Sequence, residues 1–181
     1  MPDHAPITGV ESRPYLFRGQ PAQDNWTLIR DGETPAGAAI VPLAEWLEAA
    51  PTPKLAPWLP ADTELTDSLA ARLAEASLIA IDFPTFTDGR GYSLARLLRE
   101  RHGYRGEIRA VGDVLVDQLY FMTRCGFDGL SLREDQWLED AKRALAAFSR
   151  AYQPAVDQTE PLFRRRDRER ATARKVAPAY A

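Results

Sequence analysis

The chain has few residues that bind metals or carry out redox chemistry: a single cysteine, Cys125, and two histidines, His4 and His102, among 181 residues. One cysteine excludes an internal disulfide, and within one chain it excludes a cysteine-ligated iron–sulfur cluster and a cysteine-rich zinc site. Too few histidines remain for most metal sites or for a Ser-His-Asp triad. If the protein is a redox enzyme, the identity of its cofactor is unknown.

Long apolar runs are also missing. No run approaches the length needed to cross a bilayer, and the N-terminal sequence MPDHAPITGVESRP lacks the basic-then-apolar pattern of a signal peptide. We therefore expect a cytoplasmic protein that makes no contact with membranes. With 45% hydrophobic and 27% charged residues, the composition is ordinary for a globular chain, and the length suits one domain with a sizeable core.

The most informative stretch is residues 78–113, LIAIDFPTFTDGRGYSLARLLRERHGYRGEIRAVGD, which opens with an apolar run at 78–81. A continuous apolar run of this kind predicts a strand buried on both faces, as in a parallel sheet. A polar loop follows, then a helical pattern that ends at Gly103, then a second strand over 107–111. The order is that of a βαβ unit, and both strand ends would lie at the edge where such folds bind ligands.

The same stretch carries a resemblance to a known family. The run DFPTFTDGRGYSLARLLRERHGYRGEIRAVGDVL, followed by RCGFDGLSLR, resembles the signature of the bacterial family catalogued as domain of unknown function nine-three-four, and the resemblance spans residues 40–148. Members are labelled as oxidoreductases involved in sulfite reduction, because they are encoded near assimilatory sulfite reductase. The resemblance implies a role in sulfur metabolism and a partner such as sulfite reductase or another sulfate-assimilation enzyme.

Strand spacing predicts an α/β fold of about five βα units. Candidate strands begin near residues 38, 55, 78, 107 and 127, and the separations between successive starts are typical of βα units. We expect a parallel, doubly wound sheet of the flavodoxin or Rossmann type, with helices on both faces. The alternative is a TIM-like half-barrel that closes by dimerisation, since the units are too few for an eight-stranded barrel in one chain.

Three regions are expected along the chain. Residues 1–35 form an N-terminal extension in which strands over 14–18 and 26–30 pair as a small hairpin, and residues 36–153 form a single α/β domain. The last helix of that domain carries an apolar stripe that we expect to pack on the sheet: Leu138, Leu145, Phe148 and Tyr152. Residues 154–181 form a basic tail. Pro57 predicts an edge or irregular position for the strand over 54–59.

The loop at residues 87–93 is the first candidate site. Glycines allow close backbone approach, a following helix offers free N–H groups, and arginine and serine side chains add donors for a sulfate, sulfite or phosphate group. The predicted anion-binding residues are Asp88, Gly89, Arg90, Gly91 and Ser93. The simpler alternative is a tight turn at Asp88 with Ser93 as a helix cap. The pattern is neither a Rossmann nor a Walker fingerprint.

Carboxylates form the second candidate site. Asp82 and Asp113 follow the two central strands, so with Asp88 they are expected to share a crevice and to serve Mg²⁺ binding or acid–base chemistry. The alternatives are structural, with Asp113 as an N-cap and Asp82 bonded to loop amides. For Cys125, packing at a helix end is favoured over redox chemistry.

The C-terminal tail is the third candidate site. Residues 164–175 hold seven basic and two acidic residues, a local charge of +5; since the whole chain carries −3, the remainder carries −8. Nucleic-acid binding is not expected, because no aromatic residue is interleaved among the arginines and the body is acidic. Docking on an acidic partner protein fits better. The predicted partner-binding residues are Arg164, Arg165, Arg166 and Arg168.

Two functions remain open from the sequence. The first is a non-catalytic accessory protein of assimilatory sulfate or sulfite reduction, which binds a reductase and has an oxyanion as a candidate second ligand. The second is an oxidoreductase of the same pathway, which acts on a sulfur oxyanion or a nucleotide derivative at residues 88–93 with an externally bound cofactor. No motif for flavin, nicotinamide, haem or iron–sulfur binding is visible, which favours the first.

Overall fold

The computed structural model of the chain describes residues 13–30 and 37–176. Residues 1–12, 31–36 and 177–181, which include parts of the predicted N-terminal extension and basic tail, lie outside the described residues. Eight strands form one sheet in the order β2-β1-β8-β7-β6-β5-β4-β3. The strands are β1 (Tyr15–Phe17), β2 (Gln20–Pro21), β3 (Trp26–Leu28), β4 (Ala38–Pro42), β5 (Leu55–Leu59), β6 (Leu78–Phe83), β7 (Glu107–Gly112) and β8 (Gly129–Ser131).

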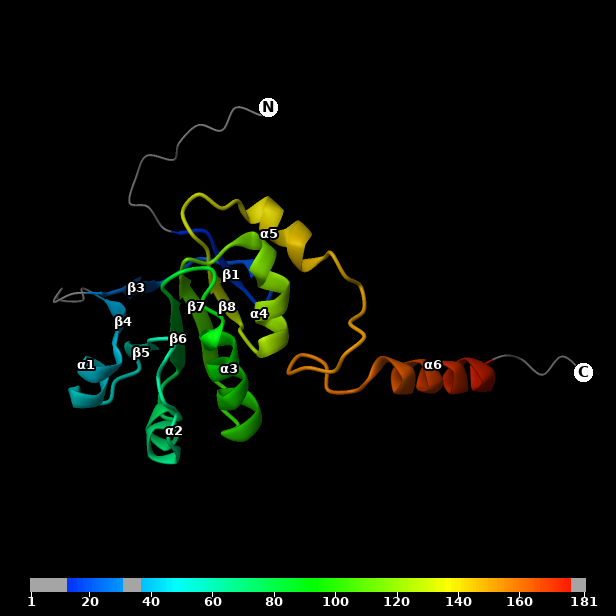
Figure 1. Cartoon of the computed structure of the whole chain (residues 1–181), viewed down its shortest axis with the longest axis horizontal. Helices are drawn as coiled ribbons and strands as arrows, with labels where there is room; N and C mark the ends of the chain where they lie inside the picture. Colours follow the sequence, from blue (N-terminus) through cyan, green and yellow to red (C-terminus); the bar gives the residue numbers. More distant parts are fainter. Residues whose placement is uncertain (1–12, 31–36, 177–181) are drawn as a thin grey trace, which may run out of the picture.

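Most helices connect successive strands of this sheet (Figure 1). The α-helices are α1 (Leu43–Glu48), α2 (Asp67–Leu73), α3 (Arg90–Arg96), α4 (Leu119–Cys125), α5 (Leu138–Leu145) and α6 (Leu162–Val176). A π-helical turn, η1 (Leu97–Arg101), continues α3, and a short 3₁₀ helix, η2 (Val116–Gln118), precedes α4. Of these, α6 stands away from the α/β body, at the end of an extended segment.

The strand order identifies the architecture as a half-barrel. Strands β3 to β8 are parallel and lie side by side in chain order. Each new parallel strand is added on the same side of the one before it. Because the crossovers between parallel strands are right-handed, this order places all the connecting helices on one face of the sheet, so the sheet has a helix-covered convex face and a concave face. The α/β class and the half-barrel alternative are confirmed. The doubly wound arrangement is wrong, since it requires a reversal of strand order that the sheet does not have.

A short connection shows how strongly the sheet is curled. β2 and β3 lie at opposite edges of the sheet, yet only residues 22–25 separate them in the chain. Eight strands laid flat would span roughly 34 Å, whereas a link of this length reaches roughly 18 Å when fully extended. The edges must therefore approach each other, and residues 22–25, here called the strap, cross the open side of the half-barrel.

An ionic network on the concave face ties the strap to the sheet. Arg109 of β7 is 2% exposed and donates from Nε to Glu107 Oε1 at 2.7 Å and from Nη1 to Asp24 Oδ1, in the strap, at 2.7 Å. The Tyr15 hydroxyl accepts from Arg109 Nη2 at 3.1 Å and donates to Glu107 at 2.8 Å. Burial raises the pKa of Tyr15, so its hydroxyl stays protonated and remains a donor.

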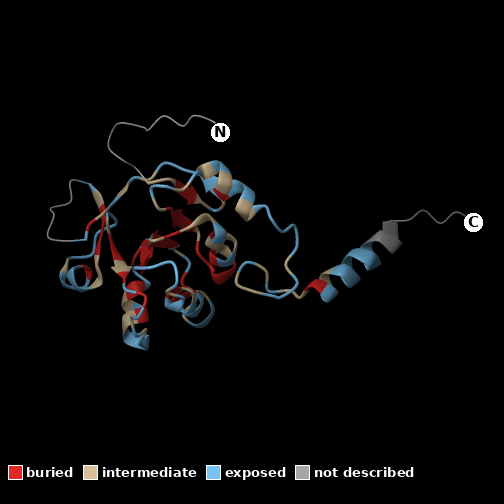
Figure 2. Cartoon of the chain, turned by 45° about the horizontal axis from the view of Figure 1, so that its top comes forward, coloured by how far each residue is buried: buried red, intermediate tan, exposed pale blue. Residues whose placement is uncertain are grey.

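Both faces of the central strand β6 are buried, as its continuous apolar run predicts. On the convex side Ile79, Ile81 and Phe83 join the main core beneath the helices. On the concave side Leu78 and Ala80 join a smaller apolar cluster. Figure 2 shows these buried residues concentrated along the sheet.

The N-terminal hairpin exists, but with different partners from those predicted. β1 pairs antiparallel with β2 through the two-residue turn Arg18-Gly19, while β3 runs parallel to β4 at the far edge of the sheet. Both turn residues have positive φ, 50° and 77°, as a type I′ hairpin turn requires. The alternation of apolar and polar residues over 14–30 is too weak to reveal that the chain crosses the half-barrel between β2 and β3.

Two further expectations are wrong. The last helix of the domain ends at Leu145, so Phe148 and Tyr152 lie outside it and are exposed instead of packing on the sheet. The edge position predicted from Pro57 is wrong, because β5 lies between β4 and β6, but the irregular alternative holds, since β5 pairs with β6 only at Trp58 and Leu59.

Candidate functional site

The predicted anion loop lies after β6, and its arginine is already paired. Arg90 donates to both carboxylate oxygens of Asp88, from Nε at 3.0 Å and from Nη2 at 2.7 Å, and a second carboxylate, Asp62, lies 3.4 Å from Nη1. The Arg90 hydrogen bonds lower the pKa of Asp88 to about 2, so the pair stays ionised at neutral pH. An oxyanion bound by both Nε and Nη2 of Arg90 would have to displace Asp88.

Packing accounts for one glycine of this loop. A Cβ at Gly91 would lie 2.7 Å from Phe83 Cζ and 3.1 Å from Ile81 Cγ2, so the first turn of α3 reaches the sheet only with glycine there. Gly89 is the N-cap of α3, has an ordinary φ of −83°, and would bring a Cβ no nearer than 3.9 Å to Tyr92. Ser93 lies within α3 and is exposed, so it is not the helix cap.

These two glycines provide a matched pair of substitutions. We expect Gly91→Ala to lower the free energy of unfolding by about 1–3 kcal/mol, because the added methyl group overpacks the contact with Phe83. We expect Gly89→Ala to change it by less than about 0.5 kcal/mol, because the position has room and unstrained dihedrals. Urea unfolding followed by tryptophan fluorescence measures both. Equal costs at the two positions would contradict the packing role of Gly91.

The two crevice carboxylates sit at the ends of neighbouring strands but bind different groups. Asp82 is buried and accepts from both terminal nitrogens of Arg30, at 2.7 and 3.2 Å. Asp113 accepts from the Phe86 backbone N–H at 2.9 Å and from Arg133 Nη1 at 2.8 Å. Asp113 thus fixes the loop after β6 and does not cap a helix, which corrects that alternative. Within residues 13–30 and 37–176, no group of three or more metal-binding side chains is gathered.

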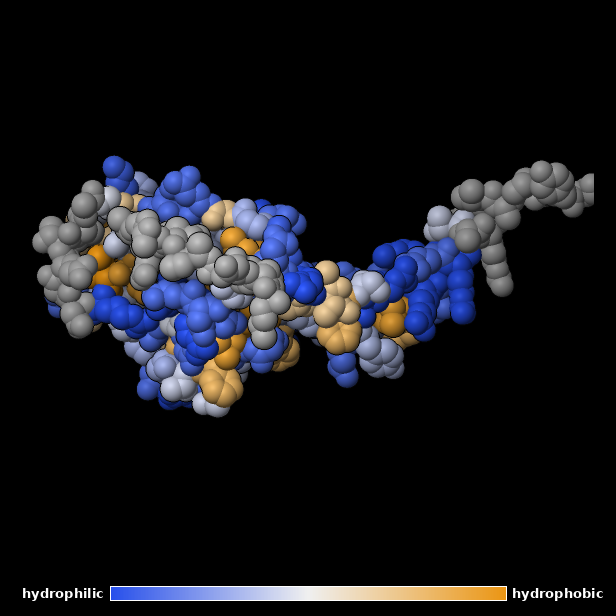
Figure 3. Space-filling view, turned by 90° about the horizontal axis from the view of Figure 1, so that it is seen from above, coloured by the Kyte–Doolittle hydropathy of each residue, from blue (hydrophilic) through white to orange (hydrophobic). Residues whose placement is uncertain are grey.

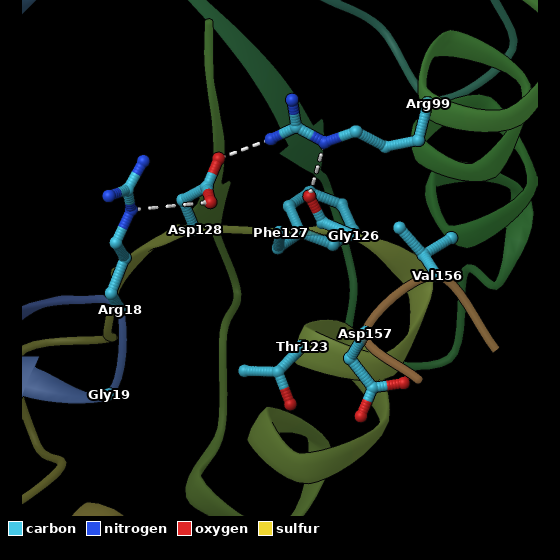
Figure 4. Close-up of a pocket in the computed structure, with 9 residues that line it drawn as sticks. All are labelled: Arg18, Gly19, Arg99, Thr123, Gly126, Phe127, Asp128, Val156 and Asp157. Carbon is cyan, nitrogen blue, oxygen red and sulfur yellow. Dashed lines mark hydrogen bonds and ion pairs between the residues drawn. The ribbon is translucent and has the colours of Figure 1, made fainter. Parts of the chain in front are cut away.

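A pocket of about 370 Å³ opens at the opposite end of the sheet, where β8 begins (Figure 4). Its walls come from four separate parts of the chain: the β1–β2 turn at Arg18, η1 at Arg99, the end of α4 at Thr123, and the extended segment at Val156 and Asp157. Asp128 lies between the walls, at the start of β8. The volume falls at the small end of the usual range for ligand pockets.

Arg99 stabilises one side of this pocket. It extends from η1, and its guanidinium donates to the carbonyls of Gly126, at 2.9 Å, and of Tyr104 and Gly106, both at 2.8 Å, and also pairs with Asp128. Nearly all its donors are therefore committed to the protein. Arg99 holds η1 against the segment that enters β8 and has little capacity left for a ligand.

Arg124 attaches the extended segment after α5 to the body. This arginine is buried; it donates from Nη2 to the Gln153 carbonyl and lies 3.3 Å from Asp157 Oδ1, while its own carbonyl accepts from the Val156 N–H at 3.1 Å. Three contacts to residues 153–157, here called the arm root, therefore meet at one residue. They form the pocket wall that contains Val156 and Asp157.

The C-terminal arm, residues 146–176, includes the arm root and carries exposed aromatic and basic side chains on both sides of it. Phe148, Tyr152 and Phe163 are 63%, 74% and 60% exposed. The predicted partner-binding residues, Arg164, Arg165, Arg166 and Arg168, all lie on α6. Arg165 donates to the Ala151 carbonyl at 2.7 Å. In the space-filling view α6 is mostly hydrophilic, with hydrophobic atoms near its first turn (Figure 3).

A family model agrees with the resemblance seen in the sequence. The model described as a bacterial protein of unknown function, DUF934, matches residues 56–163, which is more than half of the chain. The chain belongs to this family. It matches no curated protein and no solved structure. In the described part of this DUF934 protein, no helix is long and apolar enough to cross a membrane.

The DUF934 match begins in β5 and ends in the first turn of α6. It includes the crevice loop, most of the pocket and the arm root, whereas Arg18 and the rest of α6 lie outside it. Cys125, inside the match, is buried, and burial raises the pKa of its thiol, which fits the packing role predicted for it.

The pocket in this DUF934 protein could not be predicted from the sequence. Thr123, Asp128 and Asp157 come from separate segments and form no motif, so only the folded chain brings them together. The exposure of Phe148 and Tyr152 was also not predicted, because both residues continue the helical spacing of the apolar residues in α5. Pro154, which ends that pattern, was the one signal that residues near 150 leave the domain.

Proposed function

We propose that this DUF934 protein is a non-catalytic, cytoplasmic accessory protein of assimilatory sulfate or sulfite reduction, which docks on an acidic surface of a reductase through its C-terminal arm. The pathway is supported by the family resemblance, whose members are encoded near assimilatory sulfite reductase. The docking is supported by one observation in particular: α6 stands clear of the body and presents basic side chains.

The charges of the arm favour an acidic partner. α6 contains the +5 segment at residues 164–175, while the remainder of the chain carries −8. Charge concentrated on a projecting element accelerates encounter with a surface of opposite sign. The exposed rings of Phe148, Tyr152 and Phe163 add the side-chain type that dominates interface energetics. Arginine and aromatic residues together are typical of protein-binding surfaces.

An oxyanion site is a weaker part of the proposal. Arg90, the predicted anion-binding arginine, is bound to Asp88 through two hydrogen bonds, so anion binding there would cost that ion pair. The accessory function therefore rests on the arm, and the second candidate from the sequence, an oxidoreductase acting at residues 88–93, gains no specific support from this geometry.

The docking is tested by reversing charges on α6. Four described arginines on α6 are exposed; Arg168 forms an ion pair with Glu160, so the charge reversal uses the other three, Arg164, Arg166 and Arg170. We expect their combined replacement by glutamate to slow association with sulfite reductase from the same bacterium by at least about tenfold at low salt, and the difference to shrink as salt is added. Surface-immobilised reductase and a salt series measure the association rate.

The control carries the same change in net charge at a different place. Lys54, Arg105 and Arg143 are exposed on the body, and their combined replacement by glutamate leaves α6 intact. Association that slows equally in both variants would indicate a general charge effect and count against docking by the arm. Failure of the unmodified protein to bind the reductase would rule out the proposed partner.

A further inference from the structure

Aromatic side chains form an exposed patch where α3 meets α4. Tyr92 of α3 packs edge-on against Phe121 of α4, with 5.1 Å between the ring centroids, and Phe121 is 56% exposed. Phe86, 51% exposed, is fixed near the start of α4 through its backbone, whose N–H donates to Asp113 and whose carbonyl accepts from Gln118. Gln118 lies one turn before Phe121, so the two side chains are neighbours on one side of the helix. Phe86, Tyr92 and Phe121 are here called the aromatic patch.

The fold holds these rings in place. Tyr92 packs against Phe83, a buried ring of β6, with the centroids 5.3 Å apart, and Phe121 packs on Tyr92 in turn. Rings that are already immobile lose little conformational entropy on binding. Aromatic residues are also enriched among those that dominate the energetics of interfaces. An exposed cluster of rings on fixed supports is therefore typical of a docking surface.

The surroundings of the aromatic patch are negatively charged. Asp117 is exposed and forms no ion pair with any described residue. Burial raises the pKa of Tyr92 and the negative charge of Asp117 adds to this effect, so the carboxylate lies close to the patch. At the start of α3, Arg90 lies between two carboxylates, Asp88 and Asp62. Three carboxylates against one guanidinium leave a local charge of −2.

One face of α6 packs on the extended segment that precedes it. Leu162, at the start of the helix, is buried. Arg165 donates to the Ala151 carbonyl at 2.7 Å. Arg168 pairs with Glu160 at 2.6 Å. Because these three residues of α6 follow at intervals of three, they share one side of the helix, and that side is already occupied.

The other face of α6 is exposed. Phe163 is 60% exposed, and Arg166 and Arg170 are exposed and form no ion pair with any described residue. Their spacings of three and four place the three side chains in one line, here called the α6 stripe. Arg164 and Asp167 flank this line on either side, and their charges offset each other. The α6 stripe thus combines an aromatic ring with a charge of +2.

We propose that two copies of this chain form a reciprocal dimer, in which the α6 stripe of each copy docks on the aromatic patch of the other. The two surfaces match in chemistry, since each contains aromatic rings and a charge of +2 meets one of −2. α6 stands away from the body that carries its own patch, so a single copy leaves both surfaces uncovered (Figure 1). A twofold arrangement covers all four surfaces and closes the assembly.

The dimer has a consequence for regulation. It covers the face of α6 that carries Arg166 and Arg170, which are among the arginines assigned to docking on the reductase. The dimer and the reductase complex therefore exclude each other, and self-association stores the protein in a form that cannot dock. This consequence rests on the proposed function, whereas the dimer does not, because its test requires this chain alone.

Sedimentation velocity of the full chain tests the dimer. We expect the unmodified chain to shift from monomer to dimer as its concentration is raised to roughly 0.5 mM, a range that reaches weak affinities. Added salt should weaken the dimer, because exposed charges hold it together. A chain that stays monomeric over the whole range at low salt would overturn the proposal, and would mean that the two surfaces do not meet between copies.

Charge reversals on each surface identify the contact. We expect Asp117→Arg, on the patch side, and the combined Arg166→Glu and Arg170→Glu, on α6, each to raise the dimer Kd at least about tenfold. Two controls carry the same charge changes at exposed positions of the body away from both surfaces: Glu48→Arg, and the combined Lys54→Glu and Arg105→Glu. Equal weakening by the controls would overturn the assignment of these surfaces.

Mixing the two variants distinguishes exchange of α6 from any other dimer. In a mixed pair, the intact α6 of the Asp117 variant meets the intact patch of the α6 variant. At the second contact both charges are reversed, so they still attract each other. We expect the mixed dimer to be at least about tenfold tighter than the dimer of either variant alone. If mixing restores nothing while the unmodified chain dimerises, the dimer forms through another surface and the proposal is rejected.

Discussion

Replacing Arg109 with alanine is expected to lower the free energy of unfolding by about 3–5 kcal/mol, the range for breaking a buried ion pair by removing one partner. The side chain is almost fully buried on the concave face and binds two carboxylates, Glu107 and Asp24, as well as the Tyr15 hydroxyl. Without the guanidinium, both carboxylates remain largely shielded from water with no cation nearby. The cost is the desolvation of these orphaned charges, not the modest net value of the ion pairs themselves.

The strap makes this effect larger than that of an ordinary ion pair. Asp24 lies in the only described connection between the two edges of the sheet, residues 22–25, and its bond to Arg109 holds that connection over β7. Loss of Arg109 therefore also weakens the closure of the half-barrel. Asp24→Asn keeps a hydrogen-bond acceptor but removes one charge, so it should cost less than Arg109→Ala.

Urea unfolding monitored by tryptophan fluorescence measures the effect, with the midpoint and slope recorded for each variant. Lys142→Ala is the control, because Lys142 forms an exposed ion pair with Glu139 at 2.9 Å, a class worth at most about 1 kcal/mol. A loss below about 1 kcal/mol for Arg109→Ala would place it in the same class as this surface pair. That result would mean that water reaches the network and that the strap is not held by it.

Local features of the fold were predictable because they depend on neighbouring residues. The apolar run at residues 78–83 forms β6, and Gly103 follows the helical turn with a φ of 65°, the left-handed conformation that glycine favours. Strand order was not predictable. Doubly wound sheets and half-barrels are built from the same right-handed βα units, so residues within one unit do not reveal on which side of the sheet the next strand is added.

In the candidate sites, too, local placement was predictable and the contacts between distant residues were not. The loop residues Asp88 and Arg90 were placed near the carboxyl ends of the strands from local pattern alone, but their mutual ion pair depends on side-chain geometry that the pattern does not contain. The pocket is lined by four segments that are distant in the sequence, and its two arginines, Arg18 and Arg99, stand in a turn and in a π-helical turn that share no motif. Sites assembled from distant residues without a spacing motif become visible only in the folded chain.

Replacing Arg124 with alanine is expected to release the arm root and to speed cleavage of the arm by chymotrypsin roughly 10- to 100-fold. Hydrogen bonds to charged groups contribute about 1.5–3 kcal/mol, and Arg124 uses its side chain for two contacts to the root, with Gln153 and Asp157. When opening and closing are fast relative to cleavage, the cleavage rate follows the population of the open form. Phe148 and Tyr152 are exposed aromatic residues next to the root, where chymotrypsin would cut.

Arg96→Ala is the matched control, because Arg96 pairs with Glu100 on the surface of α3 and does not touch the arm. Amide exchange separates release of the root from general destabilisation. In the Arg124 variant, exchange should quicken at residues 153–157, while the amides of β6 keep their protection. Equal acceleration at both places would show that Arg124 supports the whole domain. Unchanged cleavage would show that other contacts, such as that of Phe148 with Tyr120 at 5.0 Å between ring centroids, are enough to hold the arm.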